Sequence, residues 1–464
     1  MVEEKKFDIV GNYILVTYFV FLLRTIGAWS LLPSKIDSLL FGLVGLIGGV
    51  LLVWDFVQVL RKKRTFDFDI LLVLFLIALT ISIAVNYHYS PVGNIKVLAW
   101  QAVFFLLMFS SIKFGRVAKN FLDRFQGLLI GFGFTMSLVS LAMFFTRFSY
   151  RTPLEQKTNP LRIGFVENRL FGSYTDPNYA AVMAVIVMIF SVYYLMKPTI
   201  KNGLKVFLIV NLILQFAYIA LSGSRNGLVT LLFAASLGAF FFFFHKFQGT
   251  SIKKVLIGLV AGALLASASF LAITGVKEVF PKLPAISISQ KYNDNNSELT
   301  DENEDGDEVS LGREDIQGSG DVSNLRFTIW KSAVEIFKKN PVFGMPPKSL
   351  HQYAIKEMPT TYLAQTKLAV HNAYLLLLVS TGVVGTVIML IFMVKNIVLA
   401  FIYAFKVPKM TKSFLYYLLT CGVLAVSGLF HNELFLMATS SAIVFWVCLA
   451  KMNQDMVNLG KVKK

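Results

Sequence analysis

Four short polar stretches, each beside a long apolar run, hold the side chains best suited to chemistry. They are FGSYTDPNY (171–179), SGSRNG (222–227), LRFTIW (325–330) and VHNAY (370–374). The residues of interest in them are two arginines, a histidine and an acid: Arg225, Arg326, His371 and Asp176. Guanidinium groups form paired hydrogen bonds with phosphate oxygens, and an imidazole can take or give a proton near neutral pH. These residue types predict a site for a phosphate-bearing group with a proton transfer beside it.

The elements that must position these residues are membrane helices. Of the 464 residues, 56% are hydrophobic and only 15% are charged, which is more apolar surface than a soluble protein can bury. We therefore expect an all-α polytopic membrane protein that forms one integral domain over residues 1–464. The net charge of +17 is explained by basic cytoplasmic loops rather than by nucleic acid. Cys421 and Cys448 lie inside apolar runs, with no disulfide or metal-binding pattern.

About twelve transmembrane helices are predicted, because a crossing needs roughly 17–25 mostly apolar residues. The candidate runs are 13–32, 39–60, 70–85, 97–112, 128–145, 179–196, 204–221, 228–244, 255–276, 373–394, 414–430 and 434–450. The run 397–405 is too short to span and is expected to extend the tenth helix or to lie at the interface.

The distribution of Lys and Arg predicts that both termini are cytoplasmic, since every inside segment then carries at least three positive charges. Two outside connections, 146–178 and 277–372, are long enough to cross regardless of charge. This orientation puts all four polar stretches at the extracytoplasmic face of the cell membrane.

The loop 277–372 is not uniform. Its segment 291–325 is acidic and without apolar periodicity, so flexibility is expected; DENEDG (301–306) matches half of a calcium loop, but Gly312 replaces the closing Glu, which favours a solvated charge run. The segment 326–339 predicts an amphipathic helix on the outer membrane surface. Its expected apolar face is Trp330, Ala333, Val334 and Phe337.

Each candidate also has a structural interpretation. Arg225 could be a turn residue whose side chain extends to the interface. Arg326 could pair with Asp321 or Glu335 on a wet surface, and His371 could simply cap the tenth span.

Asp176 begins an Asp-Pro-Asn turn that is an ordinary helix start. His431 and Glu433, before the twelfth span, are weaker candidates of the same kind. Arg24 in the first span is expected to form a structural pair with Asp55 in the second.

The ordered series DPN, SGSRNG, RFTIW with NPVFG, and VHNAYLLLLVSTGVVG resembles the O-antigen ligase/polymerase superfamily. This group includes O-antigen ligases and Wzy-type polymerases of O-antigen, capsule and exopolysaccharide. The match covers about residues 165–390, with the long outside loop in the expected place.

The resemblance implies a C-type glycosyltransferase fold and an undecaprenyl-diphosphate-linked oligosaccharide donor. It implies inversion at the anomeric carbon, with no metal or other cofactor. Arg225 and Arg326 would hold the diphosphate, and His371 would act as base on the acceptor hydroxyl or help to place the diphosphate. The substrate-binding residues would further include Asp176, Asn178 and Asn372.

A polymerase that joins lipid-linked repeats is the preferred interpretation, because the Lys- and Phe-rich composition is typical of low-GC organisms without an outer membrane. A ligase that transfers the glycan to another acceptor is the alternative. A sugar or lipid transporter is the second alternative, although the unusual residues lie at outer helix ends rather than at the bilayer midplane. Expected partners are the lipid-linked oligosaccharide and membrane lipids, with a flippase and a chain-length regulator as possible further partners.

Overall fold

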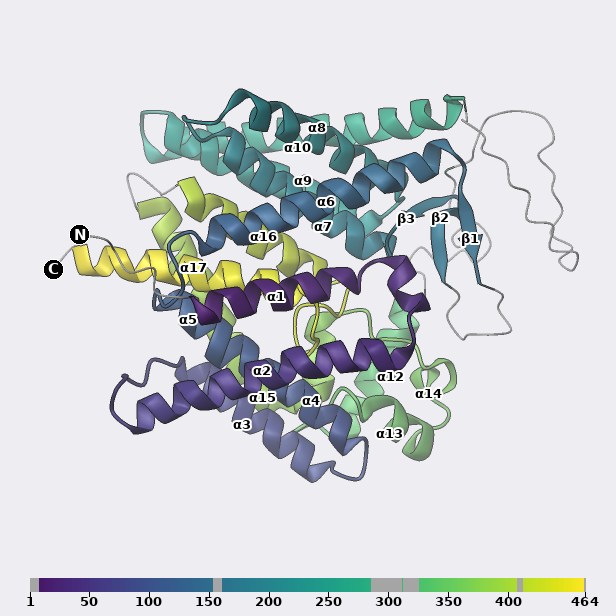
Figure 1. Cartoon of the computed structure of the whole chain (residues 1–464), viewed down its shortest axis with the longest axis vertical. Coiled ribbons are helices and arrows are strands. Elements are labelled where there is room, and N and C mark those ends of the chain that lie inside the picture. Colours follow the sequence, from purple (N-terminus) through teal and green to yellow (C-terminus); the bar gives the residue numbers. More distant parts are fainter. Residues whose placement is uncertain (1–7, 153–160, 285–310, 312–324, 407–411, 463–464) are drawn as a thin grey trace, which may run out of the picture.

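The structure, a computed structural model, describes residues 8–152, 161–284, 311, 325–406 and 412–462. Helices dominate this part of the chain (Figure 1). The predicted half calcium loop at 301–306, and all of the acidic segment 291–325 except Leu311 and Leu325, lie outside the described residues.

The described elements of the first half run from α1 to the three-strand sheet. They are α1 (Ile9–Leu23), η1 (Gly27–Leu31), α2 (Ser34–Leu60), α3 (Ile70–Val85), α4 (Pro91–Ala102), the π-helical η2 (Val103–Phe109), α5 (Ser110–Lys113), α6 (Phe121–Phe145), β1 (Ser149–Arg151), β2 (Arg162–Val166) and β3 (Arg169–Gly172).

The elements of the second half are all helices in its described part. Its elements are α7 (Pro177–Leu195), α8 (Asn202–Leu221), α9 (Arg225–Lys246), α10 (Ser251–Val279), η4 (Phe280–Lys282), α12 (Arg326–Lys339), α13 (Leu350–Glu357), α14 (Tyr362–Thr366), α15 (Ala373–Lys406), α16 (Lys412–Ser427) and α17 (Ser440–Val462).

Eight helices in the described part are long and apolar enough to cross a membrane, and three shorter apolar helices accompany them. The chain is therefore a multi-pass membrane protein. Each of the twelve predicted runs overlaps a helix, and the run 397–405 continues the tenth as α15. The number of crossings stays a prediction, because α1, α3 and α16 are short for a span.

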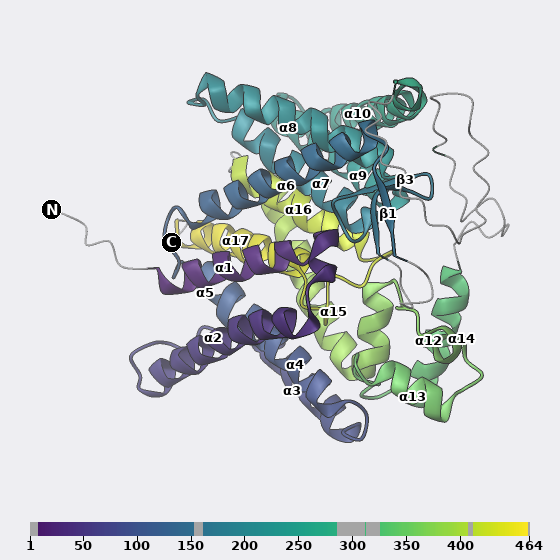
Figure 2. The same cartoon turned by 45° about the vertical axis from the view of Figure 1, so that its right-hand side comes forward.

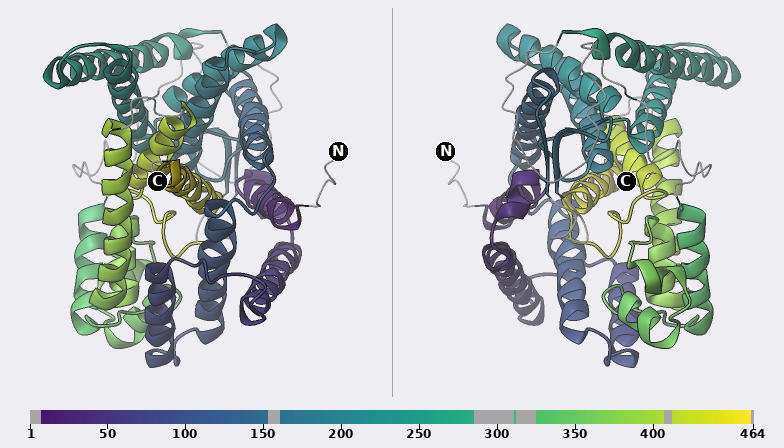
Figure 3. Two further views of the ribbon diagram at one scale, coloured as in Figure 1. Left: turned by 90° about the vertical axis from the view of Figure 1, so that its left-hand side faces the viewer. Right: turned by 90° about the vertical axis from the view of Figure 1, so that its right-hand side faces the viewer.

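The two ends of the helical body differ in character. Helix α1 begins and α17 ends at one end, together with the loop between α2 and α3 (Figures 1 and 2). That end holds ion pairs of Asp55 with Arg64 and Arg116, and of Asp69 with Lys113. The strands β1–β3 and the helices α12–α14 lie at the opposite end. Figure 3 shows α1 and α2 flanking the body on one side.

A three-stranded antiparallel sheet of order β1-β2-β3 adds to the predicted all-α architecture. Glu167 and Asn168 both have positive φ, as a two-residue hairpin turn requires. Gly172 lies against Ser140 of α6, where an added Cβ would meet the Ser140 Oγ at 2.1 Å. The sequence did not reveal these strands because three to five residues are too few to establish an alternating pattern.

Helix α15 is broken near its start at Gly382, where φ is 61° and ψ is −166°. The segment after α12 fills the break with main-chain hydrogen bonds. The Met345 N–H donates to the Val379 carbonyl at 2.7 Å, and the Val383 N–H donates to the Pro341 carbonyl at 2.8 Å. The NPVFG stretch is therefore part of how the broken helix satisfies its backbone.

The predicted pair of Arg24 with Asp55 is wrong. Helix α1 ends at Leu23, and Arg24 pairs instead with Asp37 in the first turn of α2, with Nε to Oδ1 at 2.9 Å. Asp55 lies 18 residues further along α2, which is about 27 Å at the rise of an α-helix. The first predicted span also ends early, because the Gly27 N–H donates to the Ser173 carbonyl.

The predicted start of the twelfth span is also wrong. Residues 428–439 form no helix, although His431 and Leu434–Leu436 are buried. We call residues 428–439 the inserted segment. Its apolar side chains are buried by other parts of the protein, and α17 begins only at Ser440. The sequence criterion could not separate burial in protein from burial in lipid.

Helix α12 has the expected bounds, but its buried face is turned from the predicted one. The buried residues are Ile329, Ser332, Ala333 and Ile336. They cluster with residues of α14 and α15, so protein covers this face in the structure. That α12 lies on the outer membrane surface stays a prediction.

Candidate functional site

The DPN stretch begins α7 and is tied to the SGSRNG turn. Asp176 caps α7, since its Oδ1 accepts the Asn178 N–H at 2.7 Å. Arg169, the first residue of β3, donates from Nη2 to the Asn178 Oδ1 at 2.9 Å and from Nε to the Ser222 carbonyl at 3.0 Å. The helix-start interpretation of Asp176 therefore holds. Sequence reasoning missed Arg169, because the short strand that places it was not predicted.

Arg225 is the first residue of α9, and its side chain is half-buried. Ser224 caps this helix by accepting the Gly227 N–H at 3.0 Å. The next side chain, Asn226, donates from Nδ2 to the Ser427 Oγ at 2.9 Å. The turn that carries Arg225 is thereby attached to the end of α16, where the inserted segment begins.

His371 precedes α15 in the left-handed backbone region, with φ 53°. It does not cap the helix: Asn372 does so, because its Oδ1 accepts the N–H groups of Tyr374 and Leu375 at 3.0 and 2.9 Å. The Asn372 N–H donates to the Asn432 Oδ1 at 2.9 Å. The start of α15 is therefore bound directly to the inserted segment.

The inserted segment brings a second histidine to His371. The ring centroids of His371 and His431 are 6.5 Å apart, and the rings are nearly perpendicular. The Nδ1 of His431 lies 3.9 Å from the Glu433 Oε1, and the Glu433 Oε2 accepts the Ser441 hydroxyl at 2.7 Å.

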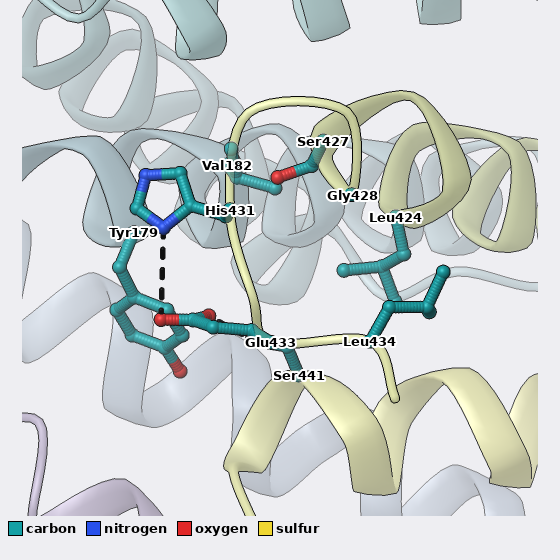
Figure 4. Close-up of a pocket in the computed structure, with 9 residues that line it drawn as sticks. All are labelled: Tyr179, Val182, Leu424, Ser427, Gly428, His431, Glu433, Leu434 and Ser441. Carbon is teal, nitrogen blue, oxygen red and sulfur yellow. Dashed lines mark hydrogen bonds and ion pairs between the residues drawn. The ribbon is translucent and has the colours of Figure 1, made fainter. Parts of the chain in front are cut away.

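Figure 4 shows the small cavity that His431, Glu433 and Ser441 help to line, with Glu433 pointing toward His431 across it. Its wall comes from α7, α16, α17 and the inserted segment. The lining residues are Tyr179, Val182, Leu424, Ser427, Gly428, His431, Glu433, Leu434 and Ser441. His431 and Glu433, the weaker candidates in the sequence, thus occupy a cavity beside the stronger ones.

Arg326, the first residue of α12, lies over the Phe430 ring, with its guanidinium carbon 5.5 Å from the ring centroid. A guanidinium over an aromatic face is attracted to the ring by a cation–π interaction. Phe430 belongs to the inserted segment, so α12 and α15 both bring a candidate residue to it.

The charged groups of these elements act on one another. Burial lowers the pKa of His371, and the nearby His431 and Arg326 lower it further, while Asp176 opposes the shift. Burial raises the pKa of Glu433, against the opposing effects of His431 and Ser441. Asp176 also raises the pKa of Glu433. Asp176 and Arg326 therefore lie near enough to His371 to act on its charge in opposite directions.

Asn178 and Asn372 both form hydrogen bonds within the protein. Each side-chain oxygen already accepts a hydrogen bond from the protein, from Arg169 and from the start of α15 respectively. Within the described residues, no group of three or more His, Cys, Asp or Glu side chains could hold a metal ion.

Fold and site together define a helical multi-pass membrane protein with an arginine- and histidine-bearing site at the helix ends. Residues 210–390 match the family model described as O-Antigen ligase, in agreement with the resemblance of this part of the sequence to the O-antigen ligase/polymerase superfamily. The matched range contains Arg225, Arg326 and His371. The inserted segment lies beyond it.

A protein of Haemophilus influenzae is similar to this chain. The two are 23% identical over 373 residues, which is 71% of this chain and 84% of that protein. That relative carries the description "Uncharacterized protein", so it extends the likeness along the chain without adding an activity.

Proposed function

We propose that this protein is a glycosyltransferase of the extracytoplasmic membrane face that polymerises undecaprenyl-diphosphate-linked oligosaccharide repeats. The observation that carries the proposal is the inserted segment, around which α12 and α15 bring Arg326 and His371 together. The turn with Arg225 is attached to the same place through Asn226 and Ser427. Arginines and a histidine at neighbouring helix ends suit a diphosphate leaving group and a hydroxyl acceptor.

In the proposed reaction the oxygen of the acceptor hydroxyl attacks the anomeric carbon of the donor sugar. The bond from that carbon to the diphosphate oxygen breaks, and the electron pair leaves with the lipid diphosphate. Arg225 and Arg326 stabilise the negative charge that develops on the leaving group. Attack opposite the leaving group inverts the anomeric centre. His371 accepts the hydroxyl proton, because its lowered pKa keeps the imidazole neutral and able to act as a base.

The ligase alternative uses the same donor and the same residues, and differs only in the acceptor. Placement of the diphosphate by His371, rather than proton transfer, is the alternative role for that residue. We propose that the site lies at the extracytoplasmic face of the cell membrane. Both termini then lie in the cytoplasm, and the donor lipid lies in the outer leaflet. A flippase would supply this donor, and a chain-length regulator would act on the product.

The test is turnover of a lipid-diphosphate-linked oligosaccharide repeat by the purified protein beside the variants Arg225→Ala, Arg326→Ala and His371→Ala. We expect a ladder of products on a gel with release of lipid diphosphate. Each variant should lower turnover by about 100-fold or more, as for the loss of a charge-stabilising or proton-transfer group. Arg151→Ala, on the exposed strand β1, is the matched control and should keep the ladder.

Release of lipid diphosphate only after a foreign acceptor is added would assign the ligase activity instead. Movement of the lipid across vesicle membranes, without turnover on any acceptor, would replace the enzyme by a transporter. A ladder of wild-type strength from correctly folded Arg225→Ala and His371→Ala would remove these residues from the site.

A further inference from the structure

Arg169 is a buried arginine that the proposed reaction does not use. Only 8% of the residue is exposed, although arginine is among the side chains least often buried without a partner. Its guanidinium reaches two different turns: Nε donates to the Ser222 carbonyl at 3.0 Å, and Nη2 donates to the Asn178 Oδ1 at 2.9 Å. One planar group therefore joins the start of α7 to the turn between α8 and α9.

The strand that carries Arg169 is itself held in place at several points. The Phe171 carbonyl accepts the Tyr218 hydroxyl of α8 at 3.1 Å. Just after the strand, the Ser173 N–H donates to the Ser140 Oγ of α6 at 3.0 Å. Because these hydrogen bonds hold β3 against α6 and α8, the Arg169 guanidinium has a defined position between the two turns.

The two turns are those that carry candidate site residues. Asn178 follows Asp176 by two positions, and Asp176 acts electrostatically on His371. Ser222 precedes Arg225 by three positions in the SGSRNG turn. A shift of either turn would move Asp176 or Arg225 relative to the inserted segment.

We infer that Arg169 is a positioning residue of this site: its guanidinium fixes the spacing between the Asp-Pro-Asn turn and the turn bearing Arg225. This inference rests on the proposed function for its kinetic consequence, but not for its structural one. Arginine is needed because its planar fork can direct separate N–H groups to the Asn178 oxygen and the Ser222 carbonyl, which a lysine ammonium cannot do in the same geometry.

The test compares Arg169→Lys with the wild type and with Arg162→Lys. Arg162, on the neighbouring strand β2, forms an ion pair with Glu167 in which Nε lies 2.8 Å from Oε1. Neither residue belongs to the two turns, so Arg162 is the matched control. The first readout is amide hydrogen exchange at Asn178 and Gly227, whose N–H groups are bonded inside the two turns. We expect faster exchange at both amides in Arg169→Lys, and wild-type exchange in Arg162→Lys.

The second readout is the steady-state kinetics on the lipid-diphosphate oligosaccharide. We expect kcat of Arg169→Lys to fall on the order of 10- to 100-fold, as for a small displacement of reacting groups. KM should change by less than about threefold, because the diphosphate-binding arginines remain present. The melting temperature should stay near that of Arg162→Lys, which separates misplacement from general loss of folded protein.

Asn178→Ala removes the acceptor at one turn only and completes the test. If Arg169 acts through Asn178, the two substitutions are not independent. The double variant should then lose clearly less turnover than the two single losses combined. Unchanged exchange at both turns in Arg169→Lys, or wild-type kcat, would overturn the inference. A wild-type protein without turnover would overturn the proposed function alone, since the exchange rates still decide whether Arg169 holds the turns.

Discussion

At the scale of single residues, the pH dependence of turnover separates the two roles open to His371. The folded-state pKa of His371 lies below the ordinary value for histidine. A base must be neutral, so kcat/KM should stay level at neutral pH and fall as the pH drops through this lowered pKa. If a protonated His371 instead placed the diphosphate, kcat/KM should fall as the pH rises through the same pKa. A pH profile of the purified enzyme distinguishes these directions.

The neighbouring His431 provides a control for that assignment. The electrostatic effect of His431 is one cause of the lowered pKa of His371. His431→Asn removes this contribution, so the pKa of His371 should rise. The acid limb of the pH profile should then move to higher pH. A limb that stays in place in His431→Asn but disappears in a slow His371→Ala enzyme would contradict the coupling of the two rings.

Residue types and their order singled out part of this candidate site. Arg225, Arg326 and His371 are candidates because a guanidinium or imidazole beside a membrane span costs free energy unless it pairs with another group or binds a ligand. Arg169 was not predicted, because its partners Asn178 and Ser222 become visible only when β3 is folded against α7 and α8. The roles of Asp176, Asn178 and Asn372 as substrate ligands stay predictions.

At the scale of elements, the break in α15 is the feature most sensitive to substitution. Gly382 and Gly344 both have positive φ, and a Cβ on Gly382 would meet the Val342 carbonyl oxygen at 2.2 Å. Helix α3 completes the contact, since the Asn86 Nδ2 donates to the Gly344 carbonyl at 3.0 Å. Because α12 and the first turns of α15 are thereby held together, the break also sets how Arg326 approaches His371.

We expect Gly382→Ala to destabilise the protein, because the backbone conformation alone costs a residue with a side chain about 1–3 kcal/mol. The close backbone contact adds to this cost. The control is Gly127→Ala in α6, where an added Cβ meets nothing within 4 Å and the helix should gain up to about 1 kcal/mol. Thermal unfolding in detergent checks both, and equal melting temperatures for the two variants would contradict the packing described at Gly382.

The elements also show where periodicity is informative and where it is not. Long apolar runs located the helices α2 to α10 and α15 because each run is continuous over several turns, whereas α13 and α14 were not predicted. The same criterion joined the inserted segment to α17, since buried loop residues such as Phe435 are as apolar as lipid-facing ones. For α12 the buried face is shifted from the predicted one: Ile329 and Ile336 are fully buried, while the predicted Trp330 and Phe337 pack partly buried against the same cluster.

At the scale of the whole molecule, the proposed function requires the site to face outward, and labelling of engineered cysteines tests this orientation. Both native cysteines, Cys421 and Cys448, are buried, so the background should be low. Lys356 in α13 is exposed at the end that carries the site, and Lys63 is exposed in the loop between α2 and α3 at the other end. A membrane-impermeant maleimide should label Lys356→Cys in intact cells.

The same reagent should label Lys63→Cys only after the cells are permeabilised, because the basic Arg61–Arg64 loop is expected in the cytoplasm. The reverse pattern would place the site inside. A donor displayed in the outer leaflet would then be out of reach, so the reaction would have to use lipid-linked sugars before they cross the membrane. Labelling of both engineered cysteines in intact cells would indicate leaky cells. A cytoplasmic protein in the same sample is the control: it stays unlabelled when the cells are intact. The orientation therefore decides which leaflet supplies the substrate, independently of any turnover measurement.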